Sequence, residues 1–274
     1  MKKKFDIQKK VIIITGAAGL LAEQHIEVVL ENKGIAILLD IDEKKIEIKK
    51  NYYLKKFKNP KIDTFVGDIT NEKFVIRVKK QIIKKYGRID VLINNAAVDY
   101  KLNEKHKKLI DKIKLESFDL NLWKKDLDVG LTGALICTKH FGNEMAKKNN
   151  GIILNIASDL SIIAPDNRIY NNNPNDLKIV KPVSYSVLKH GIIGLTKYTS
   201  VYWANKNVRC NALALGGIKK NQPKEFIKKI SNLIPLGRMA KVGEYKSSIL
   251  YMISEGSSYM NGSVVIIDGG RTVL

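Results

Sequence analysis

The sequence predicts an α/β fold: one doubly wound parallel sheet of about seven strands, with helices on both of its faces. Short runs that are apolar at nearly every position alternate with longer amphipathic stretches along the chain. Such runs are typical of parallel strands, because helices cover both faces of a parallel sheet. No glycine- or proline-rich linker divides the 274 residues, so we interpret residues 1–274 as a single domain.

The expected strands are the apolar runs, which in chain order are 11–15, 35–39, 62–66, 91–93, 152–156, 208–213 and 264–267. The expected helices are about 22–32, 43–56, 71–86, 123–147 and 183–204. The last two have the apolar spacing of a helix that packs one face on a core, whereas 43–56 is expected to be a lysine-rich surface helix. A charged insertion at 98–122 is expected to be partly helical.

A turn of small residues follows the first strand, and a helical pattern follows the turn. Gly16 allows the chain to turn, and Gly19 allows backbone N–H groups to approach a pyrophosphate at the positive end of the helix. Ala22 allows the helix to pack closely on the strand. A glycine turn alone is weak evidence for a dinucleotide-binding site, but its position after the first strand strengthens this interpretation.

Acidic residues follow the second and third strands. Asp40 can accept hydrogen bonds from both ribose hydroxyls of an adenosine and repels a 2′-phosphate. No arginine lies nearby in the sequence, so NAD is favoured over NADP as the cofactor. Asp68 is placed to accept from the adenine amino group. The alternative is that Asp40 or Asp42, and likewise Asp68, merely caps the helix that follows.

Asn94, Asn95, Ala96 and Ala97 follow the fourth strand. The carboxyl edge of a doubly wound sheet lines the cofactor crevice, and small residues there let a ligand lie against the backbone. An ordinary strand-to-loop turn, in which Asn is common, is the alternative.

Tyr185 and Lys189 are four residues apart, so a helix at 183–204 places them one above the other on one face. An ammonium group favours the phenolate, so the pKa of Tyr185 is expected to fall from about 10 towards neutrality. Tyr185 can then exchange a proton with a substrate hydroxyl. Ser158, after the fifth strand, can donate to the same oxygen. The alternatives are a tyrosine stacked on a lysine stem and an ordinary strand-end hydroxyl.

The formal net charge of +21 suggests nucleic acid or an acidic membrane surface as a partner. Most of this charge is lysine spread along the whole chain, whereas proteins that read nucleic-acid grooves depend on arginine. No basic motif with interleaved aromatic residues is present, so we disfavour nucleic-acid binding. An anionic small-molecule substrate is compatible with the charge.

Cys137 and Cys210 lie in no metal-ligand spacing, so we expect a reducing compartment and no bound metal. The basic residues 1–10 and the apolar residues 11–22 imitate a signal peptide. The apolar run contains Thr15 and Gly16, is interrupted by Glu23 and is too short to span a bilayer. A buried strand and turn explain it better, and we expect a cytoplasmic protein that does not bind membranes.

The set Thr15-Gly16-x-x-Gly19, Asn94-Asn95-Ala96-Ala97, Ser158 and Tyr185-x-x-x-Lys189, in this order, resembles the short-chain dehydrogenase/reductase family of Rossmann-fold, NAD(P)-dependent oxidoreductases. The resemblance extends from Val11 to about Val273. Three further segments, 164–166, 182–187 and 216–218, are similar to a bacterial branch found with surface-sugar and flagellin-glycan genes.

The resemblance implies that Tyr185 is the catalytic acid/base, that Lys189 lowers its pKa and holds the nicotinamide ribose, and that Ser158 steadies the reacting oxygen. It implies that the cofactor contacts the glycine turn, the strand ends and the loop after the sixth strand: Gly16, Gly19, Leu20, Leu21, Asp40, Asp68, Ile69, Asn95, Ala96, Tyr185, Lys189, Gly216 and Ile218. It further implies a small, sugar-like alcohol or carbonyl substrate, a substrate lid at 216–238, and a homodimer or homotetramer built through 123–147 and 183–204.

Several positions depart from the family pattern. Ala22 and Ala97 stand where glycine is usual, and Leu20 fills another glycine position of the first turn. Gly130 replaces an Asn that helps to hold a water molecule between the lysine and solvent, and Leu215 replaces a proline. Gly130 and Leu215 leave open an alternative function, in which the protein binds NAD(H) as a sensor or partner subunit with little or no activity.

Overall fold

In the part of the chain that the computed structural model describes, residues 2–98, 100, 107–171, 173 and 177–274, seven strands form one sheet. Their order is β3-β2-β1-β4-β5-β6-β7, and each neighbouring pair is parallel. The order reverses between β1 and β4, as it does in a doubly wound sheet. The predicted fold class is therefore confirmed.

Every run that was predicted to be a strand is one. The strands are β1 Val11–Thr15, β2 Ile35–Asp40, β3 Lys61–Val66, β4 Val91–Asn94, β5 Gly151–Ser158, β6 Val208–Leu215 and β7 Val264–Ile267. Both β5 and β6 continue two residues beyond their predicted ends, because Ala157 pairs with Ala214 and Ser158 with Leu215. The longer pairing carries Ser158 to the carboxyl edge of the sheet.

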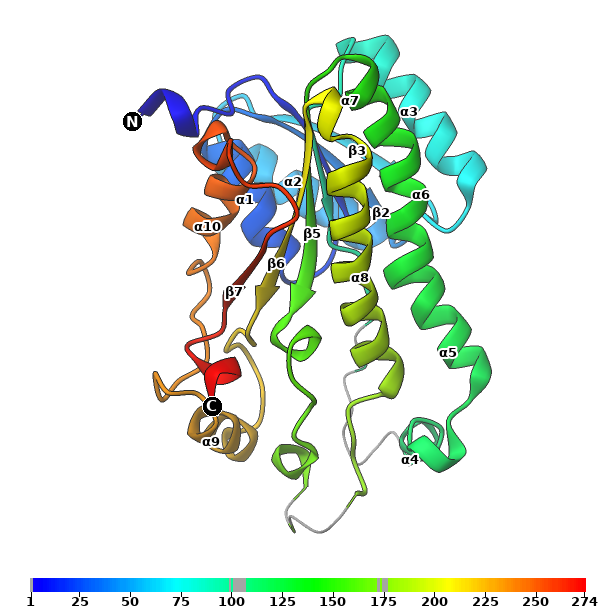
Figure 1. Ribbon diagram of the computed structural model, residues 1–274, viewed down its shortest axis with the longest axis vertical. Coiled ribbons are helices and arrows are strands. Elements are labelled where there is room, and N and C mark those ends of the chain that lie inside the picture. Colours follow the sequence, from blue (N-terminus) through cyan, green and yellow to red (C-terminus); the bar gives the residue numbers. More distant parts are fainter. Residues whose placement is uncertain (1, 99, 101–106, 172, 174–176) are drawn as a thin grey trace.

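Helices cover both faces of the sheet (Figure 1). On β1, Ile12 and Ile14 pack into a core with α1 Ala22–Glu31, α2 Glu43–Lys56 and α10 Lys246–Met252. Val11 and Ile13 point to the opposite face, whose core includes α3 Glu72–Tyr86. Helix α8 Val183–Tyr202 packs beside it on β5 and β6. A strand with two apolar faces thus fixes one core on each side.

The stretch predicted as one helix at 123–147 begins earlier and is interrupted twice. It consists of α5 Leu120–Leu127, a π-helical segment Asp128–Thr132, α6 Gly133–Cys137, a second π-helical segment Thr138–Gly142 and α7 Asn143–Lys147. The Asp119 carboxylate accepts from the N–H of Asn121 and so caps the start of α5. Single-turn π segments are common at functional sites.

The loops at the carboxyl edge of the sheet frame the site. The predicted lid at 216–238 contains α9 Lys224–Asn232, and the last turn of the chain, Arg271–Val273, lies at the same end of the molecule (Figure 1). The insertion at 98–122 contains α4 Lys107–Asp111, and its residues 99 and 101–106 lie outside the described residues. Every helix in the described ranges is too short or too polar to cross a bilayer.

Candidate active site

Tyr185 and Lys189 lie together on the first turns of α8. The Nζ atom of Lys189 is 5.8 Å from the centroid of the Tyr185 ring. It also donates a 2.7 Å hydrogen bond to the carbonyl oxygen of Ile156 on β5. Lys189 is buried, so this bond is needed to compensate part of the loss of hydration of its ammonium group.

A second ammonium group lies over the same ring. Lys181 is in the loop before α8, and its Nζ atom is 3.9 Å from the centroid of the Tyr185 ring. A lysine in this position adds positive potential at the face of the aromatic ring. Sequence reasoning missed Lys181, because it lies outside the helical repeat that relates Tyr185 to Lys189.

Ser158 is the last residue of β5, next to the start of α8. The Lys189–Ile156 bond holds α8 against the end of β5, so Ser158, Tyr185 and Lys189 are at one edge of the sheet. The Ser158 hydroxyl donates to Oδ1 of Asp159 at 2.8 Å and accepts from the N–H of Leu160 at 3.1 Å. Ser158 is buried, and its hydroxyl proton points at the Asp159 carboxylate.

A buried ion pair lies behind Ser158. Nη1 of Arg271 donates to Oδ2 of Asp159 at 2.7 Å, and each side chain is only 6% exposed. Arg271 belongs to the last turn of the chain, and no local sequence pattern indicated that it would lie beside the fifth strand.

The glycine turn after β1 is held from behind by the residues after β4. Gly16 has φ 62°, and a Cβ atom there would be 2.7 Å from Cα of Ala96, so only glycine fits without a shift. The N–H groups of Asn95 and Ala96 donate to Oγ1 of Thr15 at 3.0 and 3.1 Å. The Asn95 amide also donates to the carbonyl oxygens of Thr15 and Gly16.

The start of α1 offers backbone donors to a ligand. The N–H of Gly19 is bonded to the carbonyl of Gly16. Among the described residues, the N–H groups of Leu20 and Leu21 have no intramolecular acceptor. Unpaired N–H groups at a helix N-terminus favour an anion such as a pyrophosphate, so the turn fits a dinucleotide.

The carboxylate of Asp40 lies at the end of β2 beside this turn. It accepts from the N–H of Ala18 at 2.8 Å and from the N–H of Asp42 at 2.9 Å, one bond on each oxygen. A carboxylate has about four acceptor positions, so two remain for ribose hydroxyls. The next helix is capped by Asp42, which accepts from the N–H of Lys45.

Lys49 of α2 is a second charged group at the turn, and sequence reasoning placed it on a surface helix. Its Nζ atom donates to the carbonyl of Gly19 and lies 3.6 Å from the Glu23 carboxylate. Burial lowers the pKa of Lys49. A cation here lies close to the adenosine end of the predicted cofactor site.

The remaining predicted cofactor residues lie at the same edge in different settings. Asp68 accepts from the N–H of Thr70 at 2.8 Å and so stabilises the turn before α3. Ile69 is buried in the core on the α3 face. Gly216 accepts from the Tyr245 hydroxyl at 2.8 Å, and Ile218 pairs with Ala240. A role for these groups in cofactor binding stays a prediction.

His25, a fully buried residue of α1, supports the glycine turn through Asn95. Its Nε2 is 3.2 Å from Oδ1 of Asn95, whose amide nitrogen is already donating to the turn. Oδ1 can only accept, so Nε2 carries a proton and donates it to Asn95. Burial lowers the pKa of His25 from 6.5 to about 4.

The lowered pKa of His25 makes the free energy of unfolding depend on pH. The pKa of His25 is lower in the folded than in the unfolded protein, so its contribution is fully present above pH 6.5 and is lost as the pH falls through about 4. The shift corresponds to about 3 kcal/mol. Between pH 7 and pH 4, the free energy of unfolding of the wild type is expected to fall by up to that amount more than that of His25→Gln. Urea unfolding at both pH values measures the difference; equal losses would contradict it.

Gly130 lies in the first π-helical segment, directly against the residue before Lys189. A Cβ atom at Gly130 would be 3.0 Å from Cδ1 of Leu188, a flexible side chain that must shift by a few tenths of an ångström. Any side chain at this position therefore disturbs Leu188 as well as adding its own chemistry. A substitution here needs a matched control for size.

The pair Gly130→Ala and Gly130→Asn supplies that control. Both add a Cβ atom against Leu188, but only Asn adds an amide that can bond to a water molecule near Lys189. If such a water carries protons to the site, turnover of Gly130→Asn is expected to exceed that of Gly130→Ala roughly two- to ten-fold. Steady-state kinetics at saturating substrate compare them, and equal turnover numbers would contradict the expectation.

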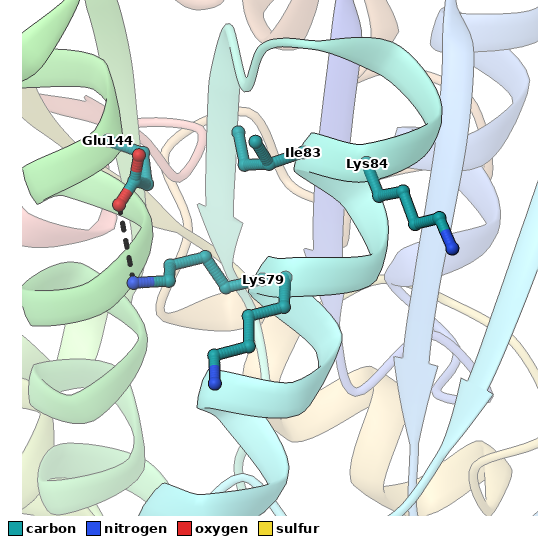
Figure 2. Close-up of a pocket in the computed structure, with 5 residues that line it drawn as sticks. Lys79, Ile83, Lys84 and Glu144 are labelled. Carbon is teal, nitrogen blue, oxygen red and sulfur yellow. Dashed lines mark ion pairs between the residues drawn. The ribbon is translucent and has the colours of Figure 1, made fainter.

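A surface hollow lies elsewhere, between α3 and α7 (Figure 2). It is lined by Lys79, Lys80, Ile83, Lys84 and Glu144, and Lys79 lies 3.2 Å from Glu144. Lys80, Ile83 and Lys84 are in the second half of α3, which runs antiparallel to the strands. The hollow is therefore near the amino edge of the sheet and separate from Tyr185.

Comparison with known proteins decides the family. Residues 16–272 match a family model described as enoyl-(acyl carrier protein) reductase. The chain belongs to the short-chain dehydrogenase/reductase family. The resemblance that the sequence motifs predicted is confirmed, and so is the Rossmann fold.

Three curated proteins illustrate how similar this chain is to its relatives. The chain is 30% identical to 3-oxoacyl-(acyl-carrier-protein) reductase FabG of Thermotoga maritima, over 97% of this chain and 99% of the relative. It is 29% identical to an NAD-dependent glycerol dehydrogenase of Listeria innocua, over 99% and 97%. It is 27% identical to post-translational flagellin modification protein A of Campylobacter coli, over 96% and 98%. The last relative agrees with the predicted branch.

Solved structures of this family share the fold. A gluconate 5-dehydrogenase from Burkholderia cenocepacia, in complex with NADP and tartrate, has a TM-score of 0.83 at 21% identity, covering 99% of this chain and 98% of that one. An NAD+-bound xylitol dehydrogenase has a TM-score of 0.83 at 22% identity, covering 96% and 99%. At these identities the likeness concerns the fold.

Proposed function

We propose that this short-chain dehydrogenase/reductase is an NAD-dependent oxidoreductase that acts on an alcohol or carbonyl group of a small, sugar-like substrate. The observation that carries the proposal is the position of Lys189, whose Nζ atom is 5.8 Å from the Tyr185 ring and bonded to the end of β5. This geometry supports Tyr185 as the proton-exchanging phenol at the carboxyl edge of the sheet, where Ser158 and the glycine turn also lie.

In this mechanism, Tyr185 gives its phenolic proton to the substrate oxygen during reduction and takes a proton from the hydroxyl during oxidation. The ammonium groups of Lys189 and Lys181 lie near the ring. They favour the ionised phenol, which is the form of Tyr185 after it gives its proton and before it takes one. Ser158 donates a hydrogen bond to the same substrate oxygen and fixes its direction. Bound nicotinamide supplies the hydride donor or acceptor.

We propose NAD rather than NADP as the preferred cofactor. Asp40 has acceptor positions for two ribose hydroxyls, and its charge repels a 2′-phosphate. Lys49 opposes this effect, since its cation is near the same turn. It is already bonded to a carbonyl and close to Glu23, so the repulsion by Asp40 is expected to dominate.

The substrate class rests on the relatives and on the charge near Tyr185. One similar relative is named as a glycerol dehydrogenase and another as an L-xylulose reductase. Hydroxycyclohexanecarboxylates are named as well. Lys181 beside the ring would favour a substrate that carries a carboxylate near the reacting hydroxyl.

We also propose a homodimer or homotetramer that uses the α8 face. Val187, Tyr198, Val201 and Tyr202 of α8 are large, exposed hydrophobic residues, as is Leu135 of α6. Such a face is unusual on a monomer and typical of an interface. Light scattering on the purified protein measures the assembly, and a monomer would contradict this proposal.

A second candidate function is NAD(H) binding with little turnover. Gly130 supports it, because this residue has no side chain to hold the water molecule that the family's usual Asn holds. The glycine turn and Asp40 would then bind the dinucleotide for sensing or for a partner subunit.

A cofactor and substrate panel separates the two functions. Glycerol, xylitol and gluconate with NAD+ or NADP+, and the matching carbonyl compounds with the reduced cofactors, are followed by the absorbance of reduced nicotinamide. The dehydrogenase proposal expects turnover with at least one substrate and faster turnover with NAD. NADH binding without turnover across the panel would favour the second candidate.

A further inference from the structure

The last turn of the chain is joined to the candidate active site by one buried contact. Arg271 begins the turn Arg271–Val273, and its guanidinium reaches Oδ2 of Asp159 at 2.7 Å. The turn is itself fixed by Asp268, whose carboxylate accepts from the N–H groups of Gly270 and Thr272 at 2.9 and 2.7 Å. The backbone on both sides of Arg271 is thus fixed by Asp268.

Asp159 connects this turn to the serine. Its Oδ2 accepts from Arg271, and its Oδ1 accepts from the Ser158 hydroxyl at 2.8 Å and from the N–H of Leu160 at 2.9 Å. Among the described residues, Asp159 is the one group with which the Arg271 side chain forms a hydrogen bond. Both charged side chains are only 6% exposed, so water cannot readily take the place of either partner. Removal of one partner therefore leaves a buried, uncompensated charge.

We propose that Arg271 and Asp159 are positioning residues for Ser158. The ion pair sets how strongly Asp159 holds the serine proton, and so how readily that hydroxyl turns to the substrate oxygen. This inference rests on the proposed dehydrogenase function. It assigns a role in the reaction to the C-terminal turn, about which the Ser-Tyr-Lys pattern says nothing.

The physical reason is that the Asp159 carboxylate shares one negative charge among three donors, which are Arg271, Ser158 and Leu160. With the guanidinium on Oδ2, the carboxylate is a weaker acceptor for Ser158. Without that cation, the buried carboxylate has Ser158 and Leu160 as its remaining donors, and it binds the serine proton more tightly. Ser158 then donates a weaker hydrogen bond to the substrate oxygen in the transition state.

Arg271→Gln is the first test, because glutamine can still donate to Asp159 but carries no charge. Its kcat is expected to fall roughly ten- to a hundred-fold, which is the scale of a hydrogen bond to a charged group. KM and the Kd for NADH are expected to stay within about two-fold of wild type, because the change affects the reacting oxygen. Arg271→Lys keeps the charge with a different geometry and is expected to lose only about three-fold.

A double-mutant cycle with Ser158→Ala shows whether Arg271 acts through the serine. In the alanine background there is no hydroxyl to position, so adding Arg271→Gln is expected to change kcat by less than about two-fold. Equal losses in the two backgrounds would overturn the inference, since they would indicate a general structural effect. If Arg271→Gln does not fold, the same cycle with Arg271→Lys decides: a loss present only with Ser158 supports the inference, and any other result overturns it.

Arg88→Gln is the control, since it makes the same substitution at a half-exposed arginine that also pairs with a buried carboxylate. Arg88 pairs with Asp90, whose side chain is only 4% exposed and also accepts from the N–H of Val11, but this pair lies at the amino edge of the sheet. The variant is expected to lose stability with kcat unchanged. The assay uses whichever of glycerol, xylitol and gluconate is turned over fastest. No turnover by the wild type would overturn the proposed function together with this inference, whereas turnover with additive losses would overturn the inference alone.

Discussion

Replacing Tyr185 by Phe is expected to lower turnover roughly 10²- to 10⁴-fold, the usual scale of general acid–base catalysis. The ring stays in place beside Lys181 and Lys189, and only the hydroxyl that exchanges the proton is lost. Affinity for NADH is expected to stay within about two-fold, because the glycine turn and Asp40 are untouched. Steady-state kinetics and NADH fluorescence measure the two quantities.

Tyr198→Phe is the matched control for this result. Tyr198 lies on the same helix, is exposed and stacks on Tyr202 at 5.8 Å, away from Lys189. Turnover by this variant is expected to equal that of the wild type. If Tyr185→Phe keeps wild-type turnover, Tyr185 is not the acid/base.

The second large effect is expected at Asp40. Asp40→Asn removes the charge that repels a 2′-phosphate, so the ratio of kcat/KM for NADP to that for NAD is expected to rise roughly 10- to 100-fold. Two charges 4 Å apart near a protein surface interact with about 4 kcal/mol, and 1.4 kcal/mol corresponds to a factor of ten. Lys49, no longer opposed by this carboxylate, contributes to the rise. Initial rates with each cofactor give the ratio.

Asp42→Asn is the control for the Asp40 experiment. Asp42 is two residues further on and caps α2, a role that asparagine performs about equally well. Its ratio for the two cofactors is expected to stay at the wild-type value. A shift in this variant as large as that in Asp40→Asn would mean that general surface charge, and not the position of Asp40, sets the preference.

The sequence predicted the strands well because most strand positions are apolar, although the edge strand β3 is half polar. The wholly apolar run of β1 packs Ile12 and Ile14 into one core and Val11 and Ile13 into another, which is typical of a sheet covered on both sides. The spacing of Tyr185 and Lys189 likewise predicted their shared face, since a helix fixes that geometry locally. The catalytic roles of Ser158, Tyr185 and Lys189 remain proposals.

What the sequence did not predict depends on contacts between distant segments. Arg271 meets Asp159 across 112 positions of the chain, and Lys49 reaches the glycine turn from the next helix. Neither belongs to a local pattern. The two π-helical segments were also missed, because the apolar spacing of 123–147 continues through them.

Tyr185 is proposed to exchange a proton while hydride passes between the nicotinamide and a substrate carbon. Mass spectrometry of the product tests this step, with a carbonyl substrate of the panel and NADH that carries deuterium at both C4 positions of the nicotinamide. We expect one deuterium on the carbinol carbon of the wild-type product and, in the same reaction time, almost none with Tyr185→Phe. Binding of the labelled NADH without deuterium in any product, or equal labelling by the two proteins, would contradict this expectation.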